Sequence, residues 1–207
     1  MAPHYFYKQE LIEQYNMALL SSDPFIKFIG FYHIMEHFYE DVYNEDMIHN
    51  VQKIIQHPGF SSKRKREVIK LIDMIKKKTR QNREELIGNE LEALELTLKK
   101  YVDINDLVNE LTEYDADIVN YYKLNEVSFS SGDAVDLRDV TNDKLYKKLA
   151  SRIYKTRNSL VHNKSNETRL NDRGIYKPFA DNKELLREIP LMRYISEAII
   201  IGSATML

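Results

Sequence analysis

Apolar residues recur at helical spacing along most of the chain, and this pattern predicts an all-α protein. Helix-start signals divide the pattern, for example at Ser22-Asp23-Pro24, where a capping side chain precedes a proline suited to the first helical position. The expected helices span residues 8–20, 24–43, 45–56, 61–78, 82–100, 105–122, 142–161 and 181–201. We therefore expect one helical bundle over residues 1–207, with an additional helical section at about 45–122.

The stretch from residue 124 to 140 does not follow the helical pattern. Residues 125–129 alternate weakly between polar and apolar, and Ser130-Ser131-Gly132-Asp133 has the composition of a turn. We expect a long loop or a small hairpin here, directly before helix 142–161. A second polar, turn-rich stretch at 163–177 predicts another loop ahead of the last helix.

Helix 142–161 is expected to have two contrasting faces. Helical spacing places one polar stripe in line with His162, made of Lys144, Lys148, Ser151, Lys155 and Asn158. The opposite stripe is mostly apolar and is predicted to pack inward: Leu145, Leu149, Ile153, Thr156 and Leu160. The helix thus presents a basic track whose three lysines are candidate contacts for RNA.

Composition narrows the class of protein. The 207 residues are 43% hydrophobic and 30% charged, with few Gly and Pro, which fits a helix-rich globular domain. The absence of Cys excludes disulfides and thiolate metal sites. The N-terminus lacks the features of a signal peptide, and no apolar run approaches the roughly 20 residues that span a bilayer. We expect a cytoplasmic protein with no membrane association.

The net charge of -2 conceals strong segregation. Residues 61–83 carry ten Lys or Arg against two acids, and residues 84–117 carry eleven acids against two lysines. We interpret these runs as solvated helix faces, with Lys63-Arg64-Lys65-Arg66 and Lys76-Lys77-Lys78 as alternative phosphate-binding patches. No interleaved aromatic residues accompany the basic run, so base stacking there is not expected.

The segment from Arg157 to His162 concentrates chemistry at the end of the basic helix. An imidazole takes or gives a proton near neutral pH, and a guanidinium binds phosphate oxygens in pairs. The Asn158 amide can orient the imidazole or the phosphate through hydrogen bonds. Cleaving RNA without a metal needs these groups, because the 2'-hydroxyl must lose a proton, the phosphorane must be stabilised and the 5'-oxygen must gain a proton. One helix supplies one Arg and one His, so two copies related by a two-fold axis would supply both acid and base.

This segment resembles the Arg-Asn-x-x-x-His form of the HEPN family motif, in particular that of toxin-type HEPN domains. The resemblance covers the motif helix and extends loosely to helix 24–43, whereas residues 45–122 have no counterpart in it. It implies an HEPN-like bundle that forms a homodimer and acts as a metal-independent endoribonuclease without a cofactor. It also implies a toxin–antitoxin or anti-phage setting, with an antitoxin or other regulatory protein as a partner. Leu160 stands where one branch of the family has a modifiable Tyr, which puts that regulation in doubt.

Two further hypotheses concern helix 24–43. Glu36 is a polar residue in a largely apolar helix, and we expect it to pair with Arg157 and hold it in place. Alternatively, His33, Glu36 and His37 spell H-x-x-E-H, a zinc-hydrolase motif that would need a third ligand such as Glu110 or Glu113.

A further alternative to the nuclease is a non-catalytic helical module that binds RNA or protein through the same dimer surface.

Overall fold

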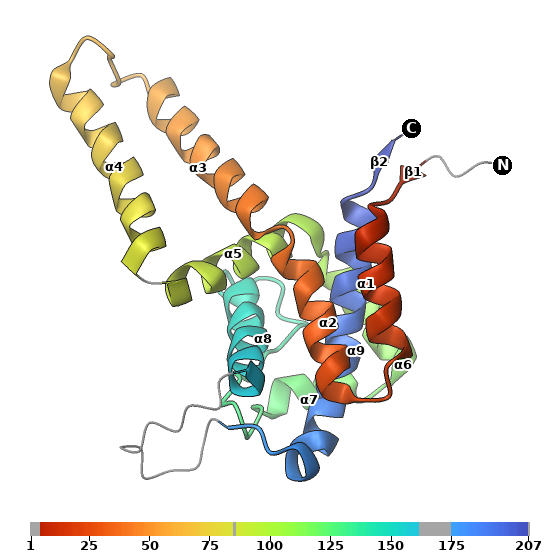
Figure 1. Ribbon diagram of the computed structural model, residues 1–207. Coiled ribbons are helices and arrows are strands. Elements are labelled where there is room, and N and C mark those ends of the chain that lie inside the picture. The colour runs from red at the N-terminus through yellow and green to blue at the C-terminus, as the bar shows by residue number, and fades with distance from the viewer. Residues whose placement is uncertain (1–4, 85, 162–174, 207) are drawn as a thin grey trace, which may run out of the picture.

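The computed structural model describes residues 5–84, 86–161 and 175–206, of which 77–84, 86–89 and 206 are described by their backbone alone. Over this part the protein is all-α, as predicted. The helices are α1 Gln9–Leu20, α2 Pro24–Glu36, α3 Tyr39–Gln56, α4 Lys65–Glu84, α5 Leu86–Tyr101, α6 Ile104–Tyr114, α7 Ile118–Leu124, α8 Leu145–Val161 and α9 Pro178–Gly202 (Figure 1). Two short antiparallel strands, β1 (Tyr5–Phe6) and β2 (Thr205–Met206), pair the two ends of this part of the chain.

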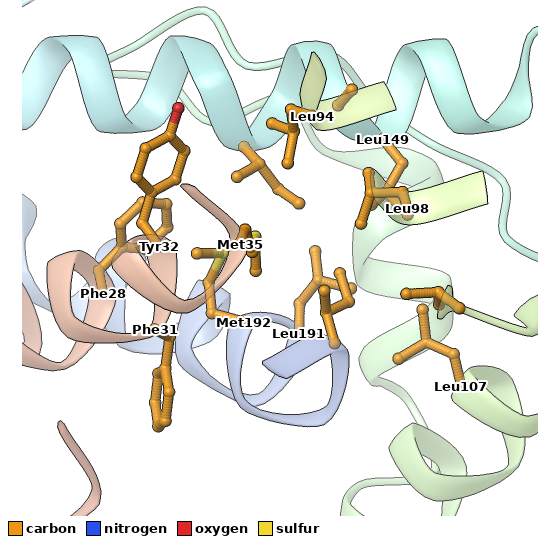
Figure 2. Packing of buried hydrophobic residues seen from close by; sticks show 14 of the residues in the cluster. Phe28, Phe31, Tyr32, Met35, Leu94, Leu98, Leu107, Leu149, Leu191 and Met192 are labelled. Atoms are coloured by element: carbon orange, nitrogen blue, oxygen red, sulfur yellow. The ribbon is translucent and has the colours of Figure 1, made fainter. Parts of the chain in front are cut away.

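The core forms where α2 packs between α1 and α9 and where α5 and α8 close over it. Figure 2 shows side chains from α2, α5, α8 and α9 meeting in one apolar cluster, including Phe28, Met35, Leu94, Leu149 and Met192. Burying one such side chain stabilises the fold by roughly 1.5–3 kcal/mol relative to leaving it exposed. The cluster therefore fixes the positions of the helices that carry the candidate site.

The inward stripe predicted for helix 142–161 is confirmed. All five of its members are buried in α8: Leu145, Leu149, Ile153, Thr156 and Leu160. The predicted hairpin before this helix is also present, because Val127 and Gly132 form an antiparallel bridge closed by a 2.9 Å hydrogen bond from the Val127 N–H to the Gly132 carbonyl. Ser131 takes a positive φ of 55° at the turn.

Several predicted helix boundaries are wrong, including the break predicted at residues 79–81, through which α4 continues to Glu84. The helix predicted over 24–43 ends at Glu36, and α3 then runs without interruption from Tyr39 to Gln56, through the predicted gap at residue 44. The break falls at His37 and Phe38, where the Phe38 side chain turns into the core and is 2% exposed. Neither Gly nor Pro lies at this break or at residue 44, so no helix-breaking residue marks it in the sequence. The burial of Phe38 determines where the helix ends.

The helix predicted over 105–122 is split into α6 and α7. Its interruption lies at Asp115, whose carboxylate accepts a 3.0 Å hydrogen bond from the Asp117 N–H and so competes with helix formation. The last helix starts at Pro178 rather than at residue 181, and the Asp181 carboxylate accepts a 2.7 Å hydrogen bond from the Lys177 N–H. Asp181 therefore caps the helix from within its first turn.

Helices α3 and α4 form a hairpin that projects from the bundle, as Figure 1 shows. Along α3 only Val42 and Tyr43 are buried, and both lie near its first turn, where α3 packs against α5. At the base, Glu45 pairs with Lys100 of α5 at 2.5 Å. The remaining length of the hairpin extends beyond the core.

Gly30 marks the closest approach of α1 and α2. A Cβ placed on Gly30 would lie 2.7 Å from the Cβ of Ala18, which is backbone-anchored and itself fully buried. We predict that Gly30→Ala destabilises the protein by roughly 1–3 kcal/mol, because the overpacking outweighs alanine's better helix propensity. Urea denaturation of the two proteins measures this. Equal or greater stability of the variant would show that α1 and α2 separate without cost.

Candidate functional site

Arg157 and Asn158 lie near the C-terminal end of α8, whereas the basic track begins near its N-terminal end. His162, the third residue of the motif, lies outside the described residues. The position of the helix is fixed by its buried face, on which Leu149, Ile153 and Thr156 contact the core. The backbone that carries Arg157 and Asn158 is thus held in place by the packing of the rest of the helix.

The Arg157 guanidinium is held by carboxylates from two other helices. Its Nη2 lies 3.3 Å from a Glu36 oxygen of α2, and its Nη1 lies 3.6 Å from a Glu90 oxygen of α5. The contact with Glu36 is the one expected from the sequence. Glu90 was not foreseen, because it lies among many acids in the 84–117 run and nothing in its spacing distinguishes it. Three helices therefore converge on one charged group.

Aromatic and amide groups complete the surroundings of Arg157. The guanidinium carbon lies 5.2 Å from the ring centroid of Tyr32, which is a cation–π contact. Nη1 also donates a 3.2 Å hydrogen bond to the Asn158 side-chain oxygen, and Asn158 in turn hydrogen-bonds to Tyr154. The Arg157 side chain nevertheless stays 17% exposed, so a ligand can still reach it.

Two tyrosine hydroxyls lie buried beside this site. Tyr32 points its hydroxyl toward α8 (Figure 2), and its ring meets that of Tyr39 edge to face, with centroids 6.3 Å apart. Neither hydroxyl has a hydrogen-bond partner of normal geometry within the described part of the protein. Burial raises the pKa of both phenols well above the ordinary value, so both are neutral at physiological pH.

We predict that Tyr32→Phe leaves stability unchanged or raises it by up to about 1 kcal/mol. The change removes a desolvated hydroxyl that gains little from a hydrogen bond, while the ring and its contact with Arg157 remain. Thermal unfolding followed by circular dichroism, with Tyr39→Phe in parallel, tests this. A loss above about 1 kcal/mol would show that the two hydroxyls bond to each other.

The basic track is partly neutralised. The Lys155 ammonium lies 3.0 Å from the Asp133 carboxylate in the loop before α8. Burial opposes the ionisation of Asp133, but hydrogen bonds from Ser151 and Lys155 outweigh it and lower the pKa of that carboxyl. Lys144 and Lys148 are exposed. Of the three lysines predicted to contact RNA, Lys144 and Lys148 are thus exposed and form no ion pair within the described residues, although the charge of Lys148 also helps to lower the pKa of Asp133.

The structure does not bring a zinc site together at His33, Glu36 and His37. One Glu36 oxygen lies 3.3 Å from Arg157 and the other 3.9 Å from His33 Nε2, but His37 faces away, toward Glu10 at 3.5 Å and Lys8 at 3.2 Å. Glu110 instead lies close to Glu197 and Arg193, so it does not serve as the third ligand. No group of three or more His, Asp or Glu side chains is arranged to hold a metal ion in the described ranges.

Arg152, five residues before Arg157, has a different role that the sequence analysis missed. It is fully buried and donates to both carboxylate oxygens of Glu188 in α9, at 2.7 and 2.8 Å. Its Nη1 donates at 2.8 Å to the carbonyls of Asn125 and Asp133, and its guanidinium lies 5.2 Å from the Tyr122 ring centroid. A signal existed, because helical spacing places this charge between Leu149 and Thr156 on the inward stripe.

Comparison with known protein families, with well-characterised proteins and with solved structures finds no match to this chain. The helices that the structure describes include none that is long and apolar enough to cross a membrane.

Proposed function

We propose that this protein is a metal-independent endoribonuclease of HEPN type, active as a homodimer with a composite site. The observation that carries the proposal is the Arg157 guanidinium, held in place by Glu36, Glu90 and Tyr32 yet partly exposed, within the same six-residue segment as Asn158 and His162. A guanidinium needed only for packing would be enclosed like that of Arg152. Holding its orientation while leaving it accessible suits an arginine that stabilises a reacting phosphate.

The proposed reaction is internal transfer at one phosphodiester bond. A His162 imidazole accepts the proton of the 2'-hydroxyl, the 2'-oxygen bonds to phosphorus, and the bond from phosphorus to the 5'-oxygen breaks. A second His162, from the partner copy, donates a proton to the leaving 5'-oxygen. The products are a 2',3'-cyclic phosphate and a 5'-hydroxyl. Arg157 stabilises the charge on the phosphorane. Asn158 orients the imidazole or the phosphate through hydrogen bonds.

The local charge at Arg157 has to be offset before a phosphate can bind there. In one copy two carboxylates face one guanidinium, so the group of Glu36, Glu90 and Arg157 carries a net negative charge that repels phosphate. A second copy contributes its own Glu36 and Glu90 with its Arg157, so two facing motifs still sum to a negative charge, and the positive charge that offsets it has to come from protonated His162 imidazoles. Lys148 on α8 and Lys144, one residue before the helix, add exposed positive charge. The expected setting is a cytoplasmic toxin or anti-phage effector with a regulatory partner protein.

The alternative is a non-catalytic module that binds RNA or protein at the same surface. The observation that favours a binding module is that Glu36 and Glu90 already balance the charge of Arg157 when no substrate is bound. The end groups of the RNA products separate the two functions. The nuclease reaction leaves 5'-hydroxyls that polynucleotide kinase labels without prior dephosphorylation, whereas incubation with a binding module creates no new labelled ends.

A further inference from the structure

The projecting hairpin of α3 and α4 carries its charges unevenly along its length. Residues 47–66, which form the outer part of α3, the turn and the start of α4, contain five Lys or Arg and no acid. The acids of α3 lie near its other end, where Glu45 pairs with Lys100 of the body. The cations of this tip, which we call the basic tip, are Lys53, Lys63, Arg64, Lys65 and Arg66.

These cations are exposed and lack carboxylate partners. All five are exposed to solvent, and none forms an ion pair with a carboxylate of the described residues. On the bundle, by contrast, lysines and arginines are commonly paired, as in Lys99 with Glu95, Lys123 with Asp136 and Arg193 with Glu197. Like charges so close together repel each other and cost the hairpin stability unless an anion compensates them.

The basic tip also has a hollow lined partly by apolar and ring side chains. A hollow of about 300 Å³ opens between the end of α3 and the start of α4, lined by Lys53, Ile54, His57, Phe60 and Glu67. The His57 ring accepts a 3.0 Å hydrogen bond from the Gly59 N–H, which holds the turn in shape. The hollow therefore places the rings of His57 and Phe60, which lie just before the basic run, beside cations that can contact phosphates. A nucleobase can lie on these rings, although the basic run itself contains no aromatic residue.

We propose that the basic tip binds the phosphodiester backbone of single-stranded RNA, so that the hairpin captures substrate at a distance from the catalytic motif. This inference rests on the proposed function for the identity of the polyanion. Long flexible cations along one side of a projecting arm suit an extended strand with regularly spaced charges. The favourable term is release of counterions from that strand, so the binding weakens steeply with salt.

The test compares two variants of equal net charge on a His162→Ala background, which prevents cleavage of the probe. The tip variant changes four cations to Gln: Lys63, Arg64, Lys65 and Arg66. The control variant makes the same change on the bundle, at Lys27, Lys123, Lys183 and Arg187. Binding of a fluorescent single-stranded RNA is measured by anisotropy over a series of salt concentrations, with thermal unfolding as the check on folding.

We expect the tip variant to lose about tenfold or more in affinity at roughly 0.1 M salt and to show a salt slope shallower by about 2–3, at about 0.7 per lost phosphate contact. The control variant should keep the salt slope of the parent. Its melting temperature should not exceed that of the tip variant, because removing the tip cations relieves their mutual repulsion. Equal affinity and slope in the two variants would overturn the proposal. The proposal would also be overturned if neither variant bound RNA while the parent protein bound vesicles containing phosphatidylserine.

Cleavage assays on the same substitutions with His162 intact keep this proposal distinct from the proposed function. Loss of RNA affinity in the tip variant, with no cleavage by any form, supports the tip and overturns the nuclease. Cleavage by the parent, with unchanged RNA affinity in the tip variant, supports the nuclease and overturns the tip.

Discussion

Replacing Arg152 with alanine is expected to cost roughly 3–5 kcal/mol of folding stability, or about 6–20 °C in melting temperature. The substitution leaves the Glu188 carboxylate in the core without its counter-charge, at 2% exposure. It also removes the donor to the carbonyls of Asn125 and Asp133, which tie the hairpin loop to α8. Thermal and urea unfolding measure the loss. A change below about 1 kcal/mol would mean that water or a neighbouring group replaces the guanidinium.

A second substitution isolates the cause. In the Arg152→Ala background, Glu188→Gln should recover part of the stability, because a neutral amide costs less to bury than an unpaired carboxylate. The two carbonyls remain without their donor, so recovery should be incomplete. Full recovery would show that the carboxylate alone accounts for the loss, and no recovery would place the loss in the loop contacts.

The same pair makes a prediction about pH. Burial raises the pKa of the Glu188 carboxyl, while the hydrogen bonds and charge of Arg152 oppose this rise. Without Arg152 the pKa is expected to rise further. A carboxyl whose folded pKa exceeds its unfolded value favours folding at low pH and loses that contribution as pH rises through the folded pKa. The stability deficit of Arg152→Ala should therefore narrow as pH falls from about 7 toward about 5.

Replacing Arg157 should have the opposite signature, with a large effect on RNA cleavage and a small one on stability. Removing a group that stabilises the transition-state charge typically lowers the rate by about 10²–10³-fold. Its partners Glu36 and Glu90 have side chains that are each 32% exposed, and ion pairs near the surface contribute only about 0–1 kcal/mol. We therefore expect Arg157→Ala to cleave poorly while melting within a few degrees of the parent.

Arg157→Lys refines this prediction, because lysine keeps the charge but loses the planar pair of donors that matches a phosphate. We expect it to recover only a small part of the rate. Arg152 and Arg157 lie five residues apart on one helix, so each is the control for the other. If Arg157→Ala unfolds as readily as Arg152→Ala, or if it cleaves at the parental rate, the role proposed for Arg157 is wrong.

The sequence predicted what local spacing controls. Helical periodicity identified the all-α class and the inward face of α8, and the polar Glu36 in an apolar helix pointed to the contact with Arg157. The junction at His37 and Phe38 was missed because it depends on where Phe38 is buried rather than on a helix breaker. The pair of Arg152 and Glu188 joins residues 36 positions apart, and spacing along one helix indicates the buried charge but not its distant partner.

The position of the hairpin was similarly beyond the reach of composition. The basic run at 61–83 and the acidic run at 84–117 read as solvated faces in sequence. Only the fold separates the tip, where residues 47–66 carry no acid, from the base, where Glu45 meets Lys100. The fold therefore turns a segregation of charge along the chain into a basic tip that projects from the bundle.

The most direct test of the account is cleavage of mixed cellular RNA by the purified protein in excess EDTA, beside His162→Ala. The account predicts cleavage by the folded, dimeric parent, fragments with 5'-hydroxyl ends, and loss of cleavage in the variant at unchanged melting temperature. Cleavage that EDTA abolishes, cleavage that survives the loss of His162, or no cleavage by a folded dimeric parent would each contradict it.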